Sequence, residues 1–99
     1  MARQLVECVP NFSEGRDAAK IDAIVQSILA VPDVVLLDRE QDADHNRSVL
    51  TFVGPPNAVA EAAVAAVEKA VAIIDLTKHQ GAHPPVLSIH LVTEFKPRS

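Results

Sequence analysis

The sequence predicts an α+β fold of the ferredoxin-like type, with the element order βαββαβ. Two long segments repeat apolar residues with helical spacing, and four short segments are rich in β-branched residues. Clusters of Pro, Gly and polar residues separate these segments, and 99 residues suffice for one domain. We therefore expect a single domain over residues 1–99, in which a four-stranded, mainly antiparallel sheet carries both helices on one face.

The first predicted strand covers residues 4–9, and we expect it to stop at Pro10 because proline cannot donate to a strand ladder. A polar, glycine-containing loop follows. Apolar residues then recur at i, i+3, i+4, i+7 and i+8 from Ile21 to Leu29, which predicts a helix with one buried face. Ser13 and Asp17 are its possible N-caps, and the proline after it ends it.

A hairpin is expected in the middle of the chain. The apolar run 34–37 predicts a buried strand, and the most polar stretch of the protein, 39–47, follows it. Residues 48–53 alternate as a further strand. Either Leu50 and Phe52, or the alternate residues of this strand (Val49, Thr51 and Val53), must face away from the helices.

The last third of the chain predicts a helix and a strand. The alanine-rich helix begins near Asn57 as its N-cap and ends near residues 75–78. Its expected buried face consists of Val59, Ala63, Ala66, Val67, Ala70, Val71 and Ile74. A His/Gly/Pro loop follows at 79–85, then a strand at 86–93 and a polar tail at 94–99.

Composition excludes several classes of protein. The net charge of −4 and the absence of Trp and Tyr argue against a nucleic-acid-binding surface. The single cysteine, Cys8, excludes an internal disulfide and a Cys-rich zinc site. No long apolar segment indicates a signal peptide or a membrane span, so we expect a cytoplasmic protein.

Two patterns suggest a metal site, and both are weak. His79 and His83 have i, i+4 spacing, but the Gly and Pro residues around them argue for a loop. The sequence Asp42-x-Asp44-x-Asn46 resembles the start of a calcium loop, but it lacks the required Gly and the terminal Glu. We expect no bound metal.

His83 is the clearest candidate for acid–base chemistry. It lies between a Gly-Ala pair and two prolines. An imidazole with a pKa near ~6.5 can take up a proton at neutral pH and return it. A histidine at the surface of a loop would fit the same pattern without any function.

Four segments in order resemble the N-terminal subdomain of the glutamate formimidoyltransferase (formiminotransferase) family. They are QLVECVPNFSEGR, LLD, NRSVLTFVGPP and IDLTKHQGAHP, and together they cover residues 4–84. The resemblance implies a ferredoxin-like subdomain and transfer of a formimino group from N-formimino-L-glutamate to N5 of tetrahydrofolate, the co-substrate. It also implies that His83 is the catalytic base, which accepts the proton of the attacking folate nitrogen.

The same resemblance suggests roles for five further residues. Arg47 could hold a substrate carboxylate through a bidentate contact. Asn11 and Asn46 offer neutral hydrogen bonds, and Asp38 or Glu40 could stabilise the positive formimino carbon. Asn11 could equally be a turn former after a proline, and Asp38 a strand-end cap.

The sequence departs from the family after Pro84. The family continues there with Arg, a hydrophobic residue and Gly-Ala, whereas this chain has Pro85-Val86-Leu87-Ser88. A second subdomain, which shares the folate site in the family, does not follow within the 99 residues. A truncation, a frameshift and a stand-alone subdomain all fit. The alternative function is therefore a non-catalytic binding or assembly module, and we expect a homodimer or pairing with a separate C-terminal subdomain.

Overall fold

The computed structural model describes residues 3–74 and 84–96; residues 1–2, 75–83 and 97–99 lie outside the described part. The elements are β1 (Arg3–Phe12), α1 (Ala18–Leu29), β2 (Val35–Asp42), β3 (Arg47–Gly54), α2 (Pro56–Ile73) and β4 (Val86–Lys96). The predicted order βαββαβ is confirmed. The strand predicted at 86–93 continues three residues further, into the segment expected to be a polar tail.

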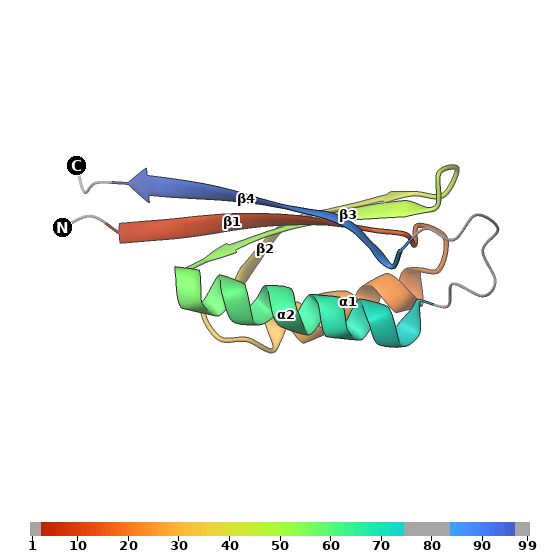
Figure 1. Cartoon of the computed structure of the whole chain (residues 1–99), viewed down its shortest axis with the longest axis horizontal. Helices are drawn as coiled ribbons and strands as arrows, with labels where there is room; N and C mark the ends of the chain where they lie inside the picture. The colour runs from red at the N-terminus through yellow and green to blue at the C-terminus, as the bar shows by residue number, and fades with distance from the viewer. Residues whose placement is uncertain (1–2, 75–83, 97–99) are drawn as a thin grey trace.

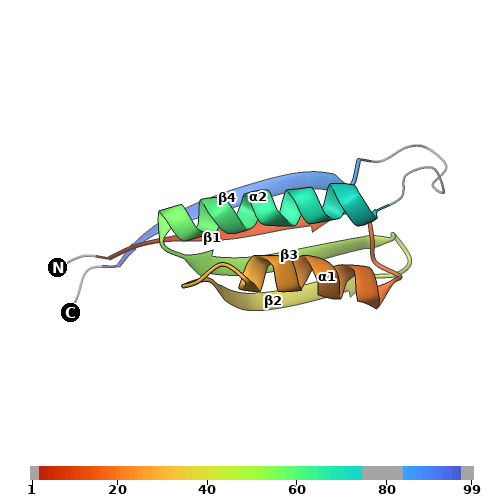
Figure 2. The same cartoon turned by 90° about the horizontal axis from the view of Figure 1, so that it is seen from below.

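The four strands form one sheet in the order β2-β3-β1-β4, and all neighbouring strands are antiparallel. Both helices cover the same face of this sheet (Figures 1 and 2), as predicted. The β1–β4 pairing begins at Arg3, whereas the β1–β3 pairing begins only at Val6. The first residues of β1 and the last of β4 therefore form a two-stranded ribbon, and the molecule is elongated, at 50 × 22 × 18 Å.

The hydrophobic core lies between the sheet and the two helices. The sheet contributes alternate residues, which include Cys8, Phe12, Leu50 and Phe52. The helices contribute the isoleucine stripe of α1 and small residues of α2, which are Ile21, Ile24, Ile28, Val59, Ala62, Ala66 and Ala70. Because Leu50 and Phe52 face the helices, the alternate residues of β3, which include Val49, Thr51 and Val53, face the open side of the sheet.

Pro10 does not stop β1, so this prediction was wrong. Pro10 is buried and pairs in register with Ile89 of β4. The β1–β3 pairing runs from Val6 to Cys8 and resumes at Asn11, which leaves a gap where proline has no N–H to donate. The ladder with β4 therefore carries the strand past Pro10, and Asn11 belongs to a strand instead of a loop.

The second strand is neither short nor buried. β2 extends through the polar residues to Asp42, and Val35 and Leu37 are 56% and 54% exposed. It lies at the edge of the sheet, with a bulge between Leu36 and Asp38. Pairing with the full length of β3 extends the strand beyond the point at which its apolar residues end.

The second helix begins at Pro56, and its N-cap lies two residues before the predicted N-cap, Asn57. Pro55 occupies the N-cap position without a side-chain hydrogen bond, and the fixed φ of Pro56 suits the first helical turn. Val59 is buried as expected, but Val71 is 61% exposed. No helix in the described ranges is long and apolar enough to cross a bilayer.

Candidate functional site

The sheet face opposite the helices brings together four of the residues predicted for the site. Residues that pair across strands point to the same face, and alternate residues of β3 define the open face. Glu40 and Asn11 both pair with Val49, from opposite sides, and Asp38 pairs with Thr51. Arg47 is the β3 residue at the hairpin end of the same face.

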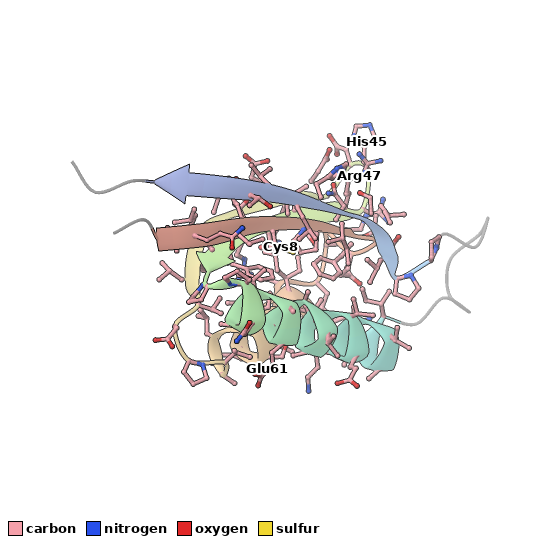
Figure 3. The ribbon with its side chains drawn as sticks, turned by 60° about the vertical axis from the view of Figure 1, so that its left-hand side comes forward. Cys8, His45, Arg47 and Glu61 are labelled. Atoms are coloured by element: carbon pink, nitrogen blue, oxygen red, sulfur yellow. The ribbon has the colours of Figure 1, made fainter. Side chains whose placement is uncertain are left out.

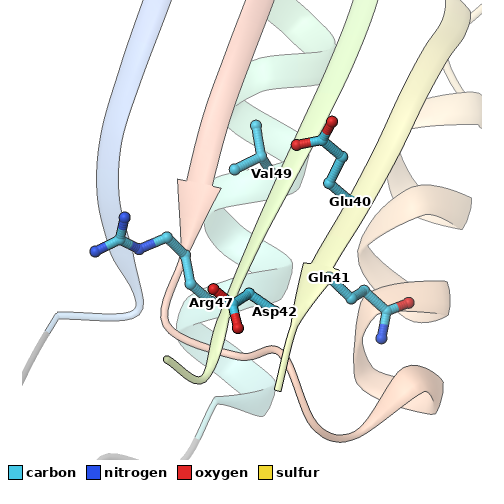
Figure 4. Close-up of a pocket in the computed structure, with 5 residues that line it drawn as sticks. All are labelled: Glu40, Gln41, Asp42, Arg47 and Val49. Carbon is cyan, nitrogen blue, oxygen red and sulfur yellow. The ribbon is translucent and has the colours of Figure 1, made fainter. Parts of the chain in front are cut away.

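An open pocket of about 520 Å³ lies at the hairpin end of this face. Its lining residues are Glu40, Gln41, Asp42, Arg47 and Val49 (Figure 4). Figure 4 shows Arg47 extending across the end of β1 toward β4, whereas Gln41 is turned away from the other four. Asp38, which precedes Glu40 by two residues in β2, does not line the pocket.

The guanidinium group of Arg47 differs from those of the other described arginine side chains. Arg39 forms an ion pair with Asp22 of α1, and Arg16 donates its Nε–H to the carbonyl of Ala43 at 2.8 Å. Among the described residues, no carboxylate lies within ion-pair distance of Arg47. Its exposed side chain therefore presents a positive charge and a fork of donors suited to a planar anion.

Asp42 also lines the pocket, although the sequence suggested it only as part of an incomplete calcium-loop pattern. It pairs with Arg47 in the β2–β3 register. Its carboxylate lies 2.6 Å from Nδ1 of His45 and also accepts the His45 backbone N–H at 3.2 Å. The side-chain hydrogen bond to His45 is the main cause of the lowered pKa of Asp42. A hairpin register that pairs position 42 with position 47 would have identified this residue.

The segment Ser13–Arg16, which follows β1, connects the parts of the site. The Ser13 hydroxyl donates to the Pro84 carbonyl at 2.6 Å, and the Ser13 N–H donates to the Pro85 carbonyl at 2.9 Å. Ser13 is therefore not the N-cap of α1. Asp17 is the N-cap, as predicted, because its side chain accepts the Ala19 N–H.

Glu14 is a buried carboxylate that the sequence analysis did not single out. It accepts the backbone N–H groups of Arg16 and Asp17 at 3.1 and 3.0 Å. Its other oxygen lies 3.7 Å from Nζ of Lys20. These contacts satisfy the charge of Glu14 locally and fix the turn that leads into α1.

Asn46 lies in the β2–β3 turn with a positive φ of 51°. Its Oδ1 accepts the Gly15 N–H at 3.0 Å, so its side chain joins the hairpin to the Ser13–Arg16 segment. The predicted site residue Asn46 thus has a structural contact in addition to its place beside Arg47. Asn11 lies at the same end of the open face, half-buried between its partners in β3 and β4.

The predicted base His83 lies outside the described residues, as does His79. The residue after His83, Pro84, is the one that Ser13 holds. The described ranges contain no group of three His, Cys, Asp or Glu side chains that could hold a metal. Cys8 lies in the core, between sheet and helices (Figure 3), and burial raises the pKa of its thiol to about 11, so it is no nucleophile at neutral pH.

The profile of the formiminotransferase domain, N-terminal subdomain, matches residues 5–92. The chain belongs to this family. The resemblance inferred from the four sequence segments is therefore confirmed.

The chain is similar to glutamate formimidoyltransferases and to formimidoyltransferase-cyclodeaminases. Over 81 residues, 82% of this chain, the identity is 51% to glutamate formimidoyltransferase of Streptococcus pyogenes serotype M1 and 53% to formimidoyltransferase-cyclodeaminase of Rattus norvegicus. Glutamate formimidoyltransferase of Thermoplasma acidophilum is 50% identical over 80 residues, 81% of the chain. The matches span 27%, 15% and 26% of these relatives, respectively, so the formiminotransferase subdomain accounts for only part of each.

Proposed function

We propose that this chain forms the part of a glutamate formimidoyltransferase that binds N-formimino-L-glutamate and carries the catalytic base. The observation that supports this most directly is the guanidinium of Arg47, which no carboxylate of the described residues pairs with, in the same pocket as the Glu40 carboxylate. N-formimino-L-glutamate carries carboxylates and a formimino group that is cationic when protonated. The pocket presents the Arg47 guanidinium together with the carboxylates of Glu40 and Asp42, of which Asp42 is bonded to His45, so Arg47 and Glu40 complement the two ends of that substrate.

Strand geometry suggests which residue meets which end of the substrate. Glu40 pairs with Val49, which is two residues from Arg47 in β3. Two residues of a strand span about 7 Å, and this separation suits a substrate of the size of glutamate lying between the two side chains. Asp38 is a further two residues away and does not line the pocket, so we assign stabilisation of the formimino carbon to Glu40.

Asn11 supplies the neutral contact in this scheme. It lies on the open face at the end of β1, toward which the Arg47 side chain extends. No hydrogen bond joins its amide group to another residue of the described ranges. A carboxamide can donate to a carboxylate and accept from an N–H, so Asn11 can orient the substrate without changing its charge.

His83 is the proposed general base. The N5 nitrogen of tetrahydrofolate attacks the formimino carbon, and His83 takes up the proton that this nitrogen loses. The tetrahedral adduct then collapses, and the glutamate nitrogen leaves as the amine with a proton returned to it. The two hydrogen bonds from Ser13 to the carbonyls of Pro84 and Pro85 support this role, because they fasten the chain directly after His83 to the end of β1.

The folate site is proposed to need more protein than this chain provides. The matches span only 15–27% of the named relatives, so we propose that a C-terminal subdomain completes the site. Tetrahydrofolate would act as co-substrate, without a metal. The alternative, a binding or assembly module that lacks the reaction, predicts ligand binding without transfer.

The test is a formimino-transfer assay on this chain together with a C-terminal half from a relative. Arg47→Ala should raise KM for N-formimino-L-glutamate by at least tenfold, because a charge-assisted bond to a carboxylate is lost. Arg39→Ala is the matched control, since Arg39 is bonded to Asp22 on the helix side, and its KM should stay unchanged. His83→Ala should lower kcat by about 10²–10⁴-fold.

Each result has a clear consequence for the proposal. No transfer by the unsubstituted protein, with binding of N-formimino-L-glutamate retained, would favour the binding module. Equal KM for the Arg47 and Arg39 variants would remove Arg47 from the substrate site. An unchanged kcat in His83→Ala would move the base elsewhere.

A further inference from the structure

We infer that Asn46 is a positioning residue, which fixes the β2–β3 hairpin, and with it Arg47, to the segment that follows β1. This inference rests on the proposed function, because it takes Arg47 as the residue that binds the substrate carboxylate. It changes the role of Asn46 from a neutral contact with substrate to a contact within the protein. The observations that carry it are a hydrogen bond, a backbone conformation and a close approach of two backbone segments.

The hydrogen bond joins parts of the chain that are 31 residues apart. Oδ1 of Asn46 accepts the N–H of Gly15 at 3.0 Å. Asn46 immediately precedes Arg47, and its positive φ of 51° is a conformation that asparagine adopts more readily than most residues. The residue type therefore serves two purposes: it closes the turn between the strands, and it supplies an acceptor to the Gly15 N–H.

The backbone of Gly15 lies against the mouth of the same hairpin. A Cβ atom at Gly15 would be 2.4 Å from the carbonyl oxygens of Asp42 and Arg47 and 2.5 Å from the Arg47 nitrogen. Arg16 adds a second connection through its bond to the Ala43 carbonyl. The hairpin is thus fastened at Ala43 and Asn46, on both sides of the turn.

The consequence concerns the geometry of the pocket. Arg47 extends over the end of β1, where Asn11 lies, and it reaches that place from a hairpin at the margin of the sheet (Figures 3 and 4). The β1–β3 pairing ends at Phe12 and Ser48, so Arg47 and the turn lie just beyond it. The Asn46–Gly15 bond, together with the Arg16–Ala43 bond, holds this end of the hairpin against the segment that follows β1.

Two variants of Asn46 and one control separate its hydrogen-bond acceptor from its tolerance for a positive φ. Asn46→Gly keeps the tolerance for positive φ and removes the acceptor, whereas Asn46→Asp keeps an acceptor at the same place. The matched control is Asp33→Gly, because Asp33 has a positive φ of 72° in the α1–β2 connection and does not line the Arg47 pocket. Each is prepared in the full chain.

The first readout is amide hydrogen exchange of the chain without substrate. In Asn46→Gly, the amides of Gly15 and of the hairpin should exchange about two- to tenfold faster, the range expected for one net hydrogen bond. Asn46→Asp should restore slow exchange, and Asp33→Gly should leave these amides unchanged. Unchanged exchange in Asn46→Gly would overturn the inference, whether or not the protein shows transferase activity.

The second readout is a double-mutant cycle with Arg47 in the transfer assay. If Asn46 acts through Arg47, Asn46→Gly raises KM about two- to tenfold alone and has no further effect in the Arg47→Ala background. Effects that multiply would mean that Asn46 contacts the substrate independently, and the inference would be wrong. Absence of transfer in the unsubstituted protein would count against the proposed function alone, since the exchange experiment needs no turnover.

Discussion

Replacing Gly15 with alanine tests the packing of the hairpin against the segment after β1. The added methyl group would lie 2.4 Å from two carbonyl oxygens, where ordinary contacts are 3.4 Å or more, so the hairpin backbone must retreat by about 1 Å. Both atoms belong to the backbone of β2 and β3, and neither can swing aside as a side chain would. The requirement for glycine here is space, and no left-handed φ is involved.

The magnitude follows from three contributions. Forcing a methyl group into a filled site costs about 1–3 kcal/mol, and retreat of the hairpin loses the Gly15–Asn46 bond, worth about 0.5–1.5 kcal/mol. The lower entropy of the unfolded alanine chain returns about 0.4–1 kcal/mol. The expected net loss in the free energy of unfolding is about 2 kcal/mol, or about 8–16 °C in Tm for a domain of this size.

The assay is thermal unfolding followed by circular dichroism, with Gly54→Ala as the comparison. A Cβ at Gly54 would lie 2.8 Å from the Asp33 carbonyl oxygen, a milder clash than that at Gly15. Gly15→Ala should therefore melt below Gly54→Ala, and both below the unsubstituted chain. A Tm for Gly15→Ala within about two degrees of that of the unsubstituted protein would contradict this expectation, because it would mean that the hairpin backbone moves without loss of stability.

Three further predictions concern the core and the open face. Burial raises the pKa of the Cys8 thiol to about 11, so the free energy of unfolding should be constant below pH 9 and fall by about 2–3 kcal/mol as the pH rises toward 11. Urea titrations should show this fall, and Cys8→Ala should lack it. Ser48→Ala should leave Tm unchanged or raise it slightly, since the buried Ser48 hydroxyl has no hydrogen-bond partner among the described residues, and a fall of several degrees would contradict this. Sedimentation equilibrium at micromolar concentration should show a homodimer, because the open sheet face carries the half-buried Val53 and the exposed Val92 away from the Arg47 pocket. A 10.6 kDa monomer at every concentration would refute it.

The sequence predicted those parts of the structure that depend on local periodicity. The apolar stripe from Ile21 to Ile28 has the period of a helix with one buried face, and the alternation of β3 has the period of a strand with one buried face. They sufficed for the element order and the sheet, but they left open which face of β3 packs against the helices, and only the structure shows that Leu50 and Phe52 do. Once the structure shows that Leu50 and Phe52 face the helices, the same alternation places Arg47 and Val49 on the open face.

The features that local patterns could not predict depend on pairing between distant segments. Pro10 continues β1 because the ladder with β4 holds it, and β2 extends over polar residues because β3 offers a full-length partner. The role of Asn46 depends on Gly15, 31 residues earlier in the chain. Contacts between distant segments produce no repeating pattern of residues in the sequence, so only the folded structure reveals them.

The most direct test of the account is a map of the surface that binds N-formimino-L-glutamate. In two-dimensional NMR spectra of the ¹⁵N-labelled chain, titration with this compound at millimolar concentration should shift the amide signals of Asn11, Arg47 and Val49. The signals of Ala62 and Ala66, on the buried face of α2, should not move. Arg47→Ala should abolish the shifts, and Arg39→Ala should preserve them. Shifts confined to the helices, or none at any concentration, would contradict the claim that the open face of the sheet binds the substrate.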